Sequence, residues 1–291
     1  MKTKGEKIFN IANIILMILI CVVIIFPLWY TVVLSLNDGS DALRGGVYLW
    51  PRKFSLENYK TVFKSRGIFQ AFGITFARTF VGVITHVLFT AMVAYAISKR
   101  NLIGRKLYIT LGIITMFFNG GLIPFYLLLK SLGLIDNFMV YILPALFSFF
   151  DLIIFQSFFR EIPESLEESA QIDGANDFYI FLNIILPLSL PVVATIGLFN
   201  GVWHWNDYFT GVIFIQNPNL QSIQTFLYKV IAESQSTQIL ASVPASVKSS
   251  NITSESIKLA TMILATIPIV CIYPFLQKYF VKGMLIGGVK E

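Results

Sequence analysis

Charged residues are scarce in this chain. Asp, Glu, Lys and Arg make up 13% of its 291 residues, hydrophobic residues make up 56%, and the mean hydropathy is +0.73. A soluble domain carries about 25% charged residues. The composition therefore excludes an ordinary soluble protein and indicates a protein of the lipid bilayer.

Cysteines and catalytic motifs are also lacking. Only Cys21 and Cys271 occur, both inside apolar stretches, which excludes a disulfide framework or a metal cluster. There is no Gly-x-x-x-x-Gly-Lys-Ser/Thr phosphate loop, so the chain is not itself an ATPase. There is also no His-Glu-x-x-His or Gly-x-Ser-x-Gly with which a membrane hydrolase could act. We therefore expect no catalytic residue, no metal and no cofactor on this chain.

Apolar runs predict an all-α integral membrane protein with six transmembrane helices in a single domain, residues 1–291. A helix needs about 20 apolar residues to cross the hydrocarbon core. Prolines and glycines inside the runs are compatible with a bundle, because neighbouring helices can satisfy the freed backbone groups. The predicted spans are residues 8–36, 69–97, 107–129, 138–159, 184–208 and 258–280.

The basic residues predict the orientation rather than nucleic-acid binding, since the net charge of +6 is scattered between the spans. Lysines precede the first span and follow the last, and Lys99, Arg100, Arg105 and Lys106 crowd the short second loop. Both termini and the acidic loop 161–183 are then cytoplasmic, and the long loop 211–257 is external. The first loop argues against this orientation because it also carries Arg44, Arg52, Lys53, Lys60, Lys64 and Arg66.

The acidic segment 161–187 predicts a folded surface between two spans. Pro163 suits a first helical turn, and the glutamates that follow complement the positive end of the helix dipole. Gly174 is a natural left-handed stop, and a second helix would begin near Asn176 or Asp177 and enter the membrane at Pro187. Two short helices bent about Gly174 would form a docking surface.

The same segment carries a family resemblance. Glu168-Ser169-Ala170, Gly174, Ile184, Leu186 and Pro187 resemble the cytoplasmic signature of bacterial ABC importer permeases, with Ser169 in place of an alanine. Residues 49–63, 205–208 and 282–290 resemble the external segment, the Trp-Asn-acid element and the tail of maltose-type carbohydrate permeases. Among these, the chain is similar to the branch that serves oligosaccharides of complex polysaccharides.

The resemblance implies a type I ABC importer permease fold with a cytoplasmic coupling helix. It also implies a bacterial plasma-membrane location, a second permease subunit, two cytoplasmic ATPases that hold ATP and Mg, an extracellular or lipoprotein solute-binding protein, and a carbohydrate substrate. No nucleic acid is expected. Glu168 would meet an ATPase, Ala170 and Ala175 would permit close approach, Gly174 would give the bend, and Asp173 would cap it. We interpret Glu164, Glu167 and Asp177 as solvated charges.

The spans contain few ionisable groups, and each is a functional hypothesis because charge is costly in lipid. Arg78 is shallow enough to snorkel to the outer surface, His86 suits helix packing, and His204 suits an interfacial aromatic belt. Asp151 is either a pore residue or a structural partner of another helix. The candidate substrate-pathway residues are Asp151, Gln156, Trp205, Asn206 and Asp207.

Two other classes of protein remain as alternatives. An ion-coupled secondary transporter or a channel would usually show related halves with several mid-span carboxylates, whereas Asp151 is the one found here. A structural scaffold would not need the signature at 168–187. The sequence leaves open the identity of the sugar and the subunit that holds it. The basic first loop suggests an acidic sugar such as a uronate oligomer, although loop charge also serves docking to a binding protein.

Overall fold

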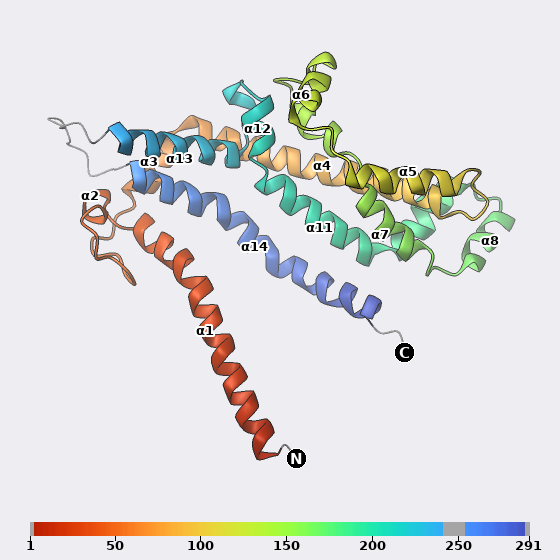
Figure 1. Ribbon diagram of the computed structural model, residues 1–291, viewed down its shortest axis with the longest axis horizontal. Coiled ribbons are helices and arrows are strands. Elements are labelled where there is room, and N and C mark those ends of the chain that lie inside the picture. Colours follow the sequence, from red (N-terminus) through yellow and green to blue (C-terminus); the bar gives the residue numbers. More distant parts are fainter. Residues whose placement is uncertain (1–2, 241–253, 289–291) are drawn as a thin grey trace. The chain divides into compact units, whose positions relative to one another are not determined.

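The structure is a computed structural model that describes residues 3–240 and 254–288. Within those residues the regular elements are helices, apart from one antiparallel bridge between Asn37 and Phe54 (Figure 1). The chain divides into two compact units, Met1–Ile68 with Leu227–Ile267 and Phe69–Phe226 with Pro268–Glu291. The elements are α1 (Lys4–Ser35), α2 (Gly39–Ala42), α3 (Glu57–Lys64), α4 (Arg66–Ser98), α5 (Arg105–Phe117), α6 (Leu122–Ser131), η1 (Phe138–Tyr141), η2 (Leu143–Ala145), α7 (Phe149–Phe159), α8 (Glu164–Ile172), α9 (Asp177–Ile180), η3 (Phe181–Ile185), α10 (Leu186–Leu188), α11 (Leu190–Asn206), α12 (Phe209–Phe214), η4 (Pro218–Leu220), α13 (Ile223–Leu240) and α14 (Ser254–Gly288).

Helix α1 dominates the first unit. A capping box begins it, because the Thr3 hydroxyl accepts from the Glu6 amide and the Glu6 carboxylate accepts from the Thr3 amide. The helix has 32 residues, which corresponds to about 48 Å and exceeds the roughly 30 Å hydrocarbon core. Its apolar side chains are exposed within the unit on all faces, as expected for a helix that meets lipid or another subunit.

The loop after α1 is held by a polar network. The Asn37 amide donates to Asp41 Oδ2 at 3.0 Å, and Arg52 Nε donates to the same oxygen at 3.0 Å. The Asn58 amide donates to the carbonyls of Ser35 and Asn37, both at 2.9 Å. The Asn37 hydrogen bond and the Arg52 charge keep the pKa of Asp41 below its usual 3.8. Part of the basic charge of this loop is therefore engaged within the loop itself.

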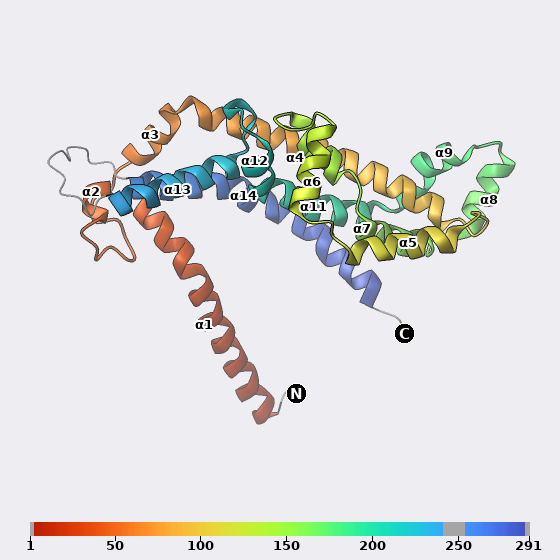
Figure 2. The same ribbon diagram turned by 45° about the horizontal axis from the view of Figure 1, so that its top comes forward.

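Helix α4 organises the second unit. Ala91 and Ala94 of α4, Leu152 and Phe155 of α7 and Ile185 of η3 are buried in one core. Helix α7 packs against both α5 and α11, and α8 with α9 lies at one end of this bundle (Figure 2). Small residues permit the close contacts, because a side chain at Gly82 would overlap the His204 ring and one at Gly112 would overlap Phe149.

Three of the six predicted spans are bent. Helices α1, α4 and α14 are each long and apolar enough to cross a membrane unbroken. The pairs α5 with α6, η1–η2 with α7, and α9–α10 with α11 reach that length only together, with bends of 116°, 49° and 82°. Gly121, in the first break, has a φ of +84° that favours glycine. The described residues thus offer up to six spans, and the all-α fold is confirmed.

The region that was predicted as the long loop 211–257 contains ordered helix. Helix α13 occupies Ile223–Leu240, and residues 241–253 lie outside the described residues. Helix α14 covers the predicted span 258–280, and its backbone continues through most of the tail motif. Residues 289 and 290 of that motif lie outside the described residues.

Candidate functional site

The predicted coupling segment, residues 161–187, folds as two short helices joined at a glycine before it enters the bundle, as its sequence predicts. Helix α8 ends with the Gly174 amide donating to the Gln171 carbonyl at 3.0 Å and the Ala175 amide donating to the Ala170 carbonyl at 2.9 Å. These two bonds define a Schellman C-cap, which needs a left-handed residue between them. Gly174 supplies it with a φ of +86°.

The second part of the segment leads into the membrane bundle. The Asn176 side chain caps α9 by accepting from the Tyr179 amide at 2.8 Å. The chain then passes through the π-helical turn η3 and α10, which contains Pro187, into α11. Five residues of the segment pack against the buried core of the unit: Ile162, Ala170, Ala175, Ile184 and Leu186. Movement of α8–α9 would therefore be transmitted to packed helices.

The acidic face of α8 is paired with the basic turn after α4. Lys99 forms an ion pair with Glu167, and its ammonium lies 4.2 Å from the centre of the Tyr95 ring. Arg100 Nε lies 3.0 Å from Glu164 Oε1, and Lys99 Nζ lies 4.0 Å from Asp177 Oδ1. The interpretation as solvated charges agrees with the structure for Glu164 and Asp177, which are exposed, and is wrong for Glu167, whose side chain is 24% exposed. Its partner, Lys99, lies 68 residues away, so local sequence does not reveal the pairing.

Glu168 is the third glutamate of α8. Glu168 is exposed and has no hydrogen-bond or ion-pair partner within the described part of the chain. It lines a polar cavity of about 510 Å³ together with Lys99, Arg100 and Gln171. Burial alone would lower the pKa of Lys99, but its hydrogen bonds to Glu167 and Tyr95 outweigh that effect and raise it above 10.5. Ser169 and Asp173 are also exposed.

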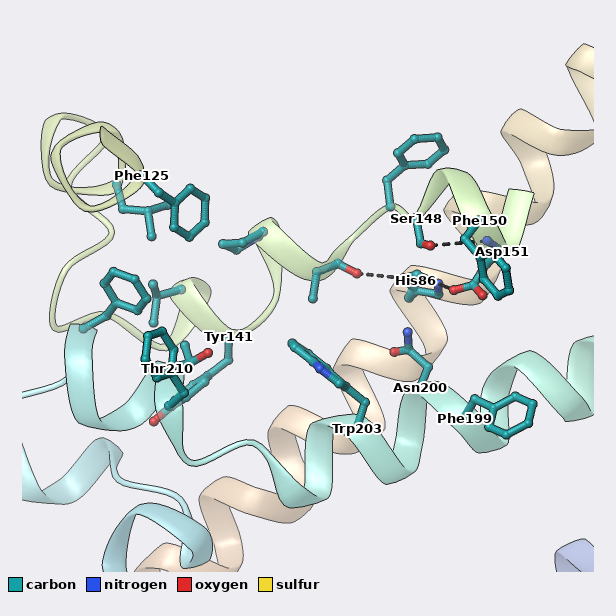
Figure 3. A pocket seen from close by; sticks show the side chains of 17 residues that line it. His86, Phe125, Tyr141, Ser148, Phe150, Asp151, Phe199, Asn200, Trp203 and Thr210 are labelled. Carbon is teal, nitrogen blue, oxygen red and sulfur yellow. Dashed lines mark hydrogen bonds and ion pairs between the residues drawn. The ribbon is translucent and has the colours of Figure 1, made fainter. Parts of the chain in front are cut away.

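A second site is a pocket of about 560 Å³ inside the second unit (Figure 3). Helices α4, α6, α7, α11 and α12 line it, together with the η1–η2 segment and the loop that follows. Its polar residues are His86, Tyr141, Ser148, Asp151, Asn200, Trp203 and Thr210, and its apolar residues include Phe125, Phe147, Phe150, Phe199 and Phe209.

His86 and Asp151 form the polar centre of this pocket. His86 Nε2 lies 2.9 Å from Asp151 Oδ2, and His86 Nδ1 lies 2.7 Å from the Ala145 carbonyl oxygen. A carbonyl only accepts, and an ionised carboxylate only accepts. Nδ1 therefore donates to the Ala145 carbonyl, while Nε2 faces the Asp151 carboxyl group, and these two contacts fix the orientation of the imidazole ring.

A buried ion pair lies beside Tyr141, one of the residues that line this pocket. Arg78 Nη2 lies 2.5 Å from Asp207 Oδ2, and Arg78 Nη1 donates to the Asp207 carbonyl at 3.0 Å. The guanidinium carbon lies 4.2 Å from the centre of the Tyr141 ring. Arg78 is 0% exposed, so the expectation that it snorkels to the surface was wrong. A partner 129 residues away in the sequence retains the charge inside the bundle.

The structure separates the predicted pathway residues. Asp151 lines the pocket from the first turn of α7, whose N-cap is Ser148. Gln156 is buried and donates to the Ile97 carbonyl at 3.1 Å. Trp205 packs edge-to-face on Phe76 at 5.1 Å and lines a different, apolar cavity of about 340 Å³. Asn206 is exposed and donates to the Val202 carbonyl at 2.9 Å.

Of the residues that line the pocket, only Asp151 was among the predicted site residues. His86, Asn200 and Trp203 line the pocket, and the last two are three residues apart on α11, which places them on one helical face. This three-residue spacing is the sequence feature that could have predicted that Asn200 and Trp203 share a site. His204 was interpreted as part of an interfacial aromatic belt, but it is 0% exposed and its ring packs against Gly82, with no hydrogen-bond partner among the described residues.

Comparisons with known proteins agree on one family. A family model described as "Binding-protein-dependent transport system inner membrane component" matches residues 2–286. The chain is 38% identical to Protein LplC of Bacillus subtilis, covering 99% of this chain and 97% of that protein. It is 39% identical to the polygalacturonan/rhamnogalacturonan transport system permease protein YtcP of the same organism, covering 94% and 93%. A crystal structure of a bacterial ABC transporter involved in import of the acidic polysaccharide alginate contains a similar chain, with a TM-score of 0.86, 29% identity and coverage of 96% and 99%.

Proposed function

Because the chain belongs to the family of binding-protein-dependent transport system inner membrane components, we propose that it is the permease subunit of an ATP-driven importer for an oligosaccharide. The observation that carries this proposal is the coupling segment, which presents Glu168 on a capped helix that is built into the transmembrane core. The names of similar proteins, which include a polygalacturonan/rhamnogalacturonan transport system permease and a transporter involved in alginate import, support a saccharide as the cargo.

The proposal includes several partners. A second permease would complete the translocation pathway, two cytoplasmic ATPases would bind ATP and Mg and hydrolyse the nucleotide, and an external solute-binding protein would deliver the sugar. The family is one of binding-protein-dependent transporters, which supports the last partner. This chain contributes the pathway and the docking surface and is not itself an enzyme.

The coupling mechanism follows from how α8 is attached. An ATPase that binds Glu168, Ser169 and the α8–α9 bend at Asp173 and Gly174 would move a capped helix that is packed on the bundle, and not a flexible loop. One attachment runs from Glu167 through Lys99 to α4. The other runs through Ala175, Ile184, Leu186 and Pro187 to α11. ATPase closure would thus rotate α4 and α11 together, and these helices carry His86, Asn200 and Trp203.

The orientation belongs to the same proposal. The basic turn at 99–106 and the acidic segment at 161–183 form ion pairs, so they lie on one side of the membrane. The positive-inside rule favours the cytoplasm for that turn, and an ATPase requires the same side for α8. We place both termini there as well, in a bacterial plasma membrane.

Reconstitution tests the function. The chain is co-expressed with a partner permease and an ATPase of the same transporter class, purified, and placed in liposomes with a binding protein. ATP-dependent uptake of oligosaccharide that disappears when any one component is omitted is the expected result. Uptake by this chain alone, driven by an ion gradient, would instead establish a secondary transporter or channel.

A further inference from the structure

The pocket around His86 and Asp151 has the features of a ligand site in its own right. Its volume of about 560 Å³ lies within the roughly 300–1,000 Å³ of small-molecule pockets. Aromatic side chains form most of its walls, and a few polar groups converge at one end (Figure 3). Resting on the proposed function, we propose that this pocket is a sugar subsite within this subunit, and that it takes an uncharged, hydroxyl-bearing sugar ring rather than a uronate.

The first support is an array of acceptors for sugar hydroxyl groups. Asp151 uses Oδ2 to contact His86, and its Oδ1 has no partner in the described part of the chain. The Asp151 side chain is 20% exposed, so a ligand in the pocket can reach it. The Asn200 side-chain oxygen is buried and also has no partner among the described residues. A buried acceptor left without a donor is costly, and a hydroxyl group would satisfy it.

The second support is an exposed aromatic platform. Trp203 is 50% exposed although it lies on a helix packed inside the bundle. In Figure 3, Trp203 and Asn200 project from α11 into the pocket, on the side facing His86. Sugar rings combine hydroxyl edges with less polar C–H faces, so an indole face beside hydrogen-bonding groups is a complementary surface. Trp205, two residues away, lies outside this pocket.

The charge of the pocket decides the class of sugar. None of the described residues that line it is Lys or Arg. Asp151 is the carboxyl group of the lining, and the His86 ring beside it is already engaged by Asp151 Oδ2 and by the Ala145 carbonyl. Arg78, which stacks on Tyr141 of the lining, is bound by Asp207. A uronate carboxylate would meet Asp151 without a Lys or Arg to balance it, and desolvating it there would be unfavourable. The basic residues of the first loop are not among those that line this pocket, so they do not change the charge of its lining.

Equilibrium binding to the complete purified assembly tests the proposal. The probes are a panel of radiolabelled neutral trisaccharides built from glucose, galactose, arabinose or rhamnose, with trigalacturonate as the acidic counterpart. We expect at least one neutral probe to bind and to exceed trigalacturonate. Asp151→Asn should weaken that binding about tenfold, the typical effect of removing a hydrogen bond to a charged group, and should narrow the gap to trigalacturonate.

Trp203→Leu and Trp205→Leu provide the matched pair, because both remove an indole from α11 and only Trp203 lines the pocket. Trp203→Leu should weaken binding about 2- to 10-fold, and Trp205→Leu should leave it unchanged in protein that still assembles. Equal effects of the two changes, tighter binding of trigalacturonate, or no binding of any probe would overturn the subsite. An assembly that lacks an ATPase would overturn the proposed function instead, so the two failures are distinguishable.

Discussion

Lys99, in the turn after α4, forms an ion pair with Glu167 on helix α8 and lies over the ring of Tyr95. The contact joins two segments 68 residues apart and attaches helix α8 to the longest helix of the second unit. Both side chains are about one quarter exposed, 29% and 24%, so the pair contributes little to stability, about 1 kcal/mol or less. Its value would lie in transmitting force.

This relationship gives a charge-reversal prediction. Lys99→Glu should lower the thermal midpoint by a few degrees at most, because the pair is partly exposed. It should reduce the number of sugar molecules transported per ATP hydrolysed, because α8 loses its attachment to α4. Glu167→Lys in the same chain should restore much of the coupling. If the double variant couples no better than either single variant, the ion pair does not transmit force.

Gly174→Ala should impair coupling through backbone conformation alone. Gly174 has a φ of +86°, and an added Cβ meets nothing within 4 Å in the described structure. The substitution therefore costs about 1–2 kcal/mol of left-handed strain without a clash. Gly133→Ala is the matched control, because its φ is +69° and its Cβ is equally free. In the Gly174 variant the rate of uptake should fall relative to the rate of ATP hydrolysis. In the control the ratio of the two rates should equal that of the wild type.

Glu168→Lys should leave membrane insertion intact and uncouple ATP hydrolysis from uptake. Glu168 is exposed on α8 and has no partner in the described part of the chain, so its loss should not disturb the fold. Glu161→Lys changes the same charge at another exposed position, outside the signature. Normal sugar-stimulated ATPase activity in the Glu168 variant would argue against the docking role.

The buried Arg78–Asp207 pair should be essential for assembly. Asp207→Asn leaves a guanidinium that is 0% exposed without its counter-charge, and such losses cost about 3–5 kcal/mol. Arg78→Met leaves the carboxylate unpaired and should be similarly harmful. The double variant Arg78→Met with Asp207→Asn should recover a large part of the yield and of the thermal midpoint. Additive losses in the double variant would show that the two residues act independently.

The contribution of Asp41 and its hydrogen bonds to stability should be lost only in acid. The Asn37 hydrogen bond, followed by Arg52, lowers the pKa of Asp41 below 3.8. Its contribution to stability is therefore complete above pH 3.8 and is lost as the pH falls through the lowered value. Wild type and Asp41→Asn should differ in thermal midpoint at neutral pH and converge in strong acid. A difference in thermal midpoint that is as large in strong acid as at neutral pH would contradict this assignment.

Local signals explain what the sequence predicts well. The acidic first turn, Gly174 and Asn176 predicted α8, its stop and the start of α9, because caps depend on residues within one helical turn. Long apolar runs likewise predicted helices able to span the bilayer. Run length carries no information on direction, however, so the bend of 116° between α5 and α6 was not predicted.

Contacts between residues that are distant in the sequence could not be predicted from neighbouring residues. Arg78 and Asp207 are 129 positions apart, and their pairing changes Arg78 from a surface cation into a buried one. Helix α11 is apolar on all sides, so its composition does not say which tryptophan faces the pocket. Trp203 does so and Trp205 does not, because packing against α4 fixes the rotation of the helix.

The most direct measurement is the composition of the purified assembly. The tagged chain is extracted in mild detergent, and the proteins that accompany it are identified and counted. We predict one copy of this chain, one second permease and two ATPase subunits. A homo-oligomer of this chain with no ATPase would contradict this prediction.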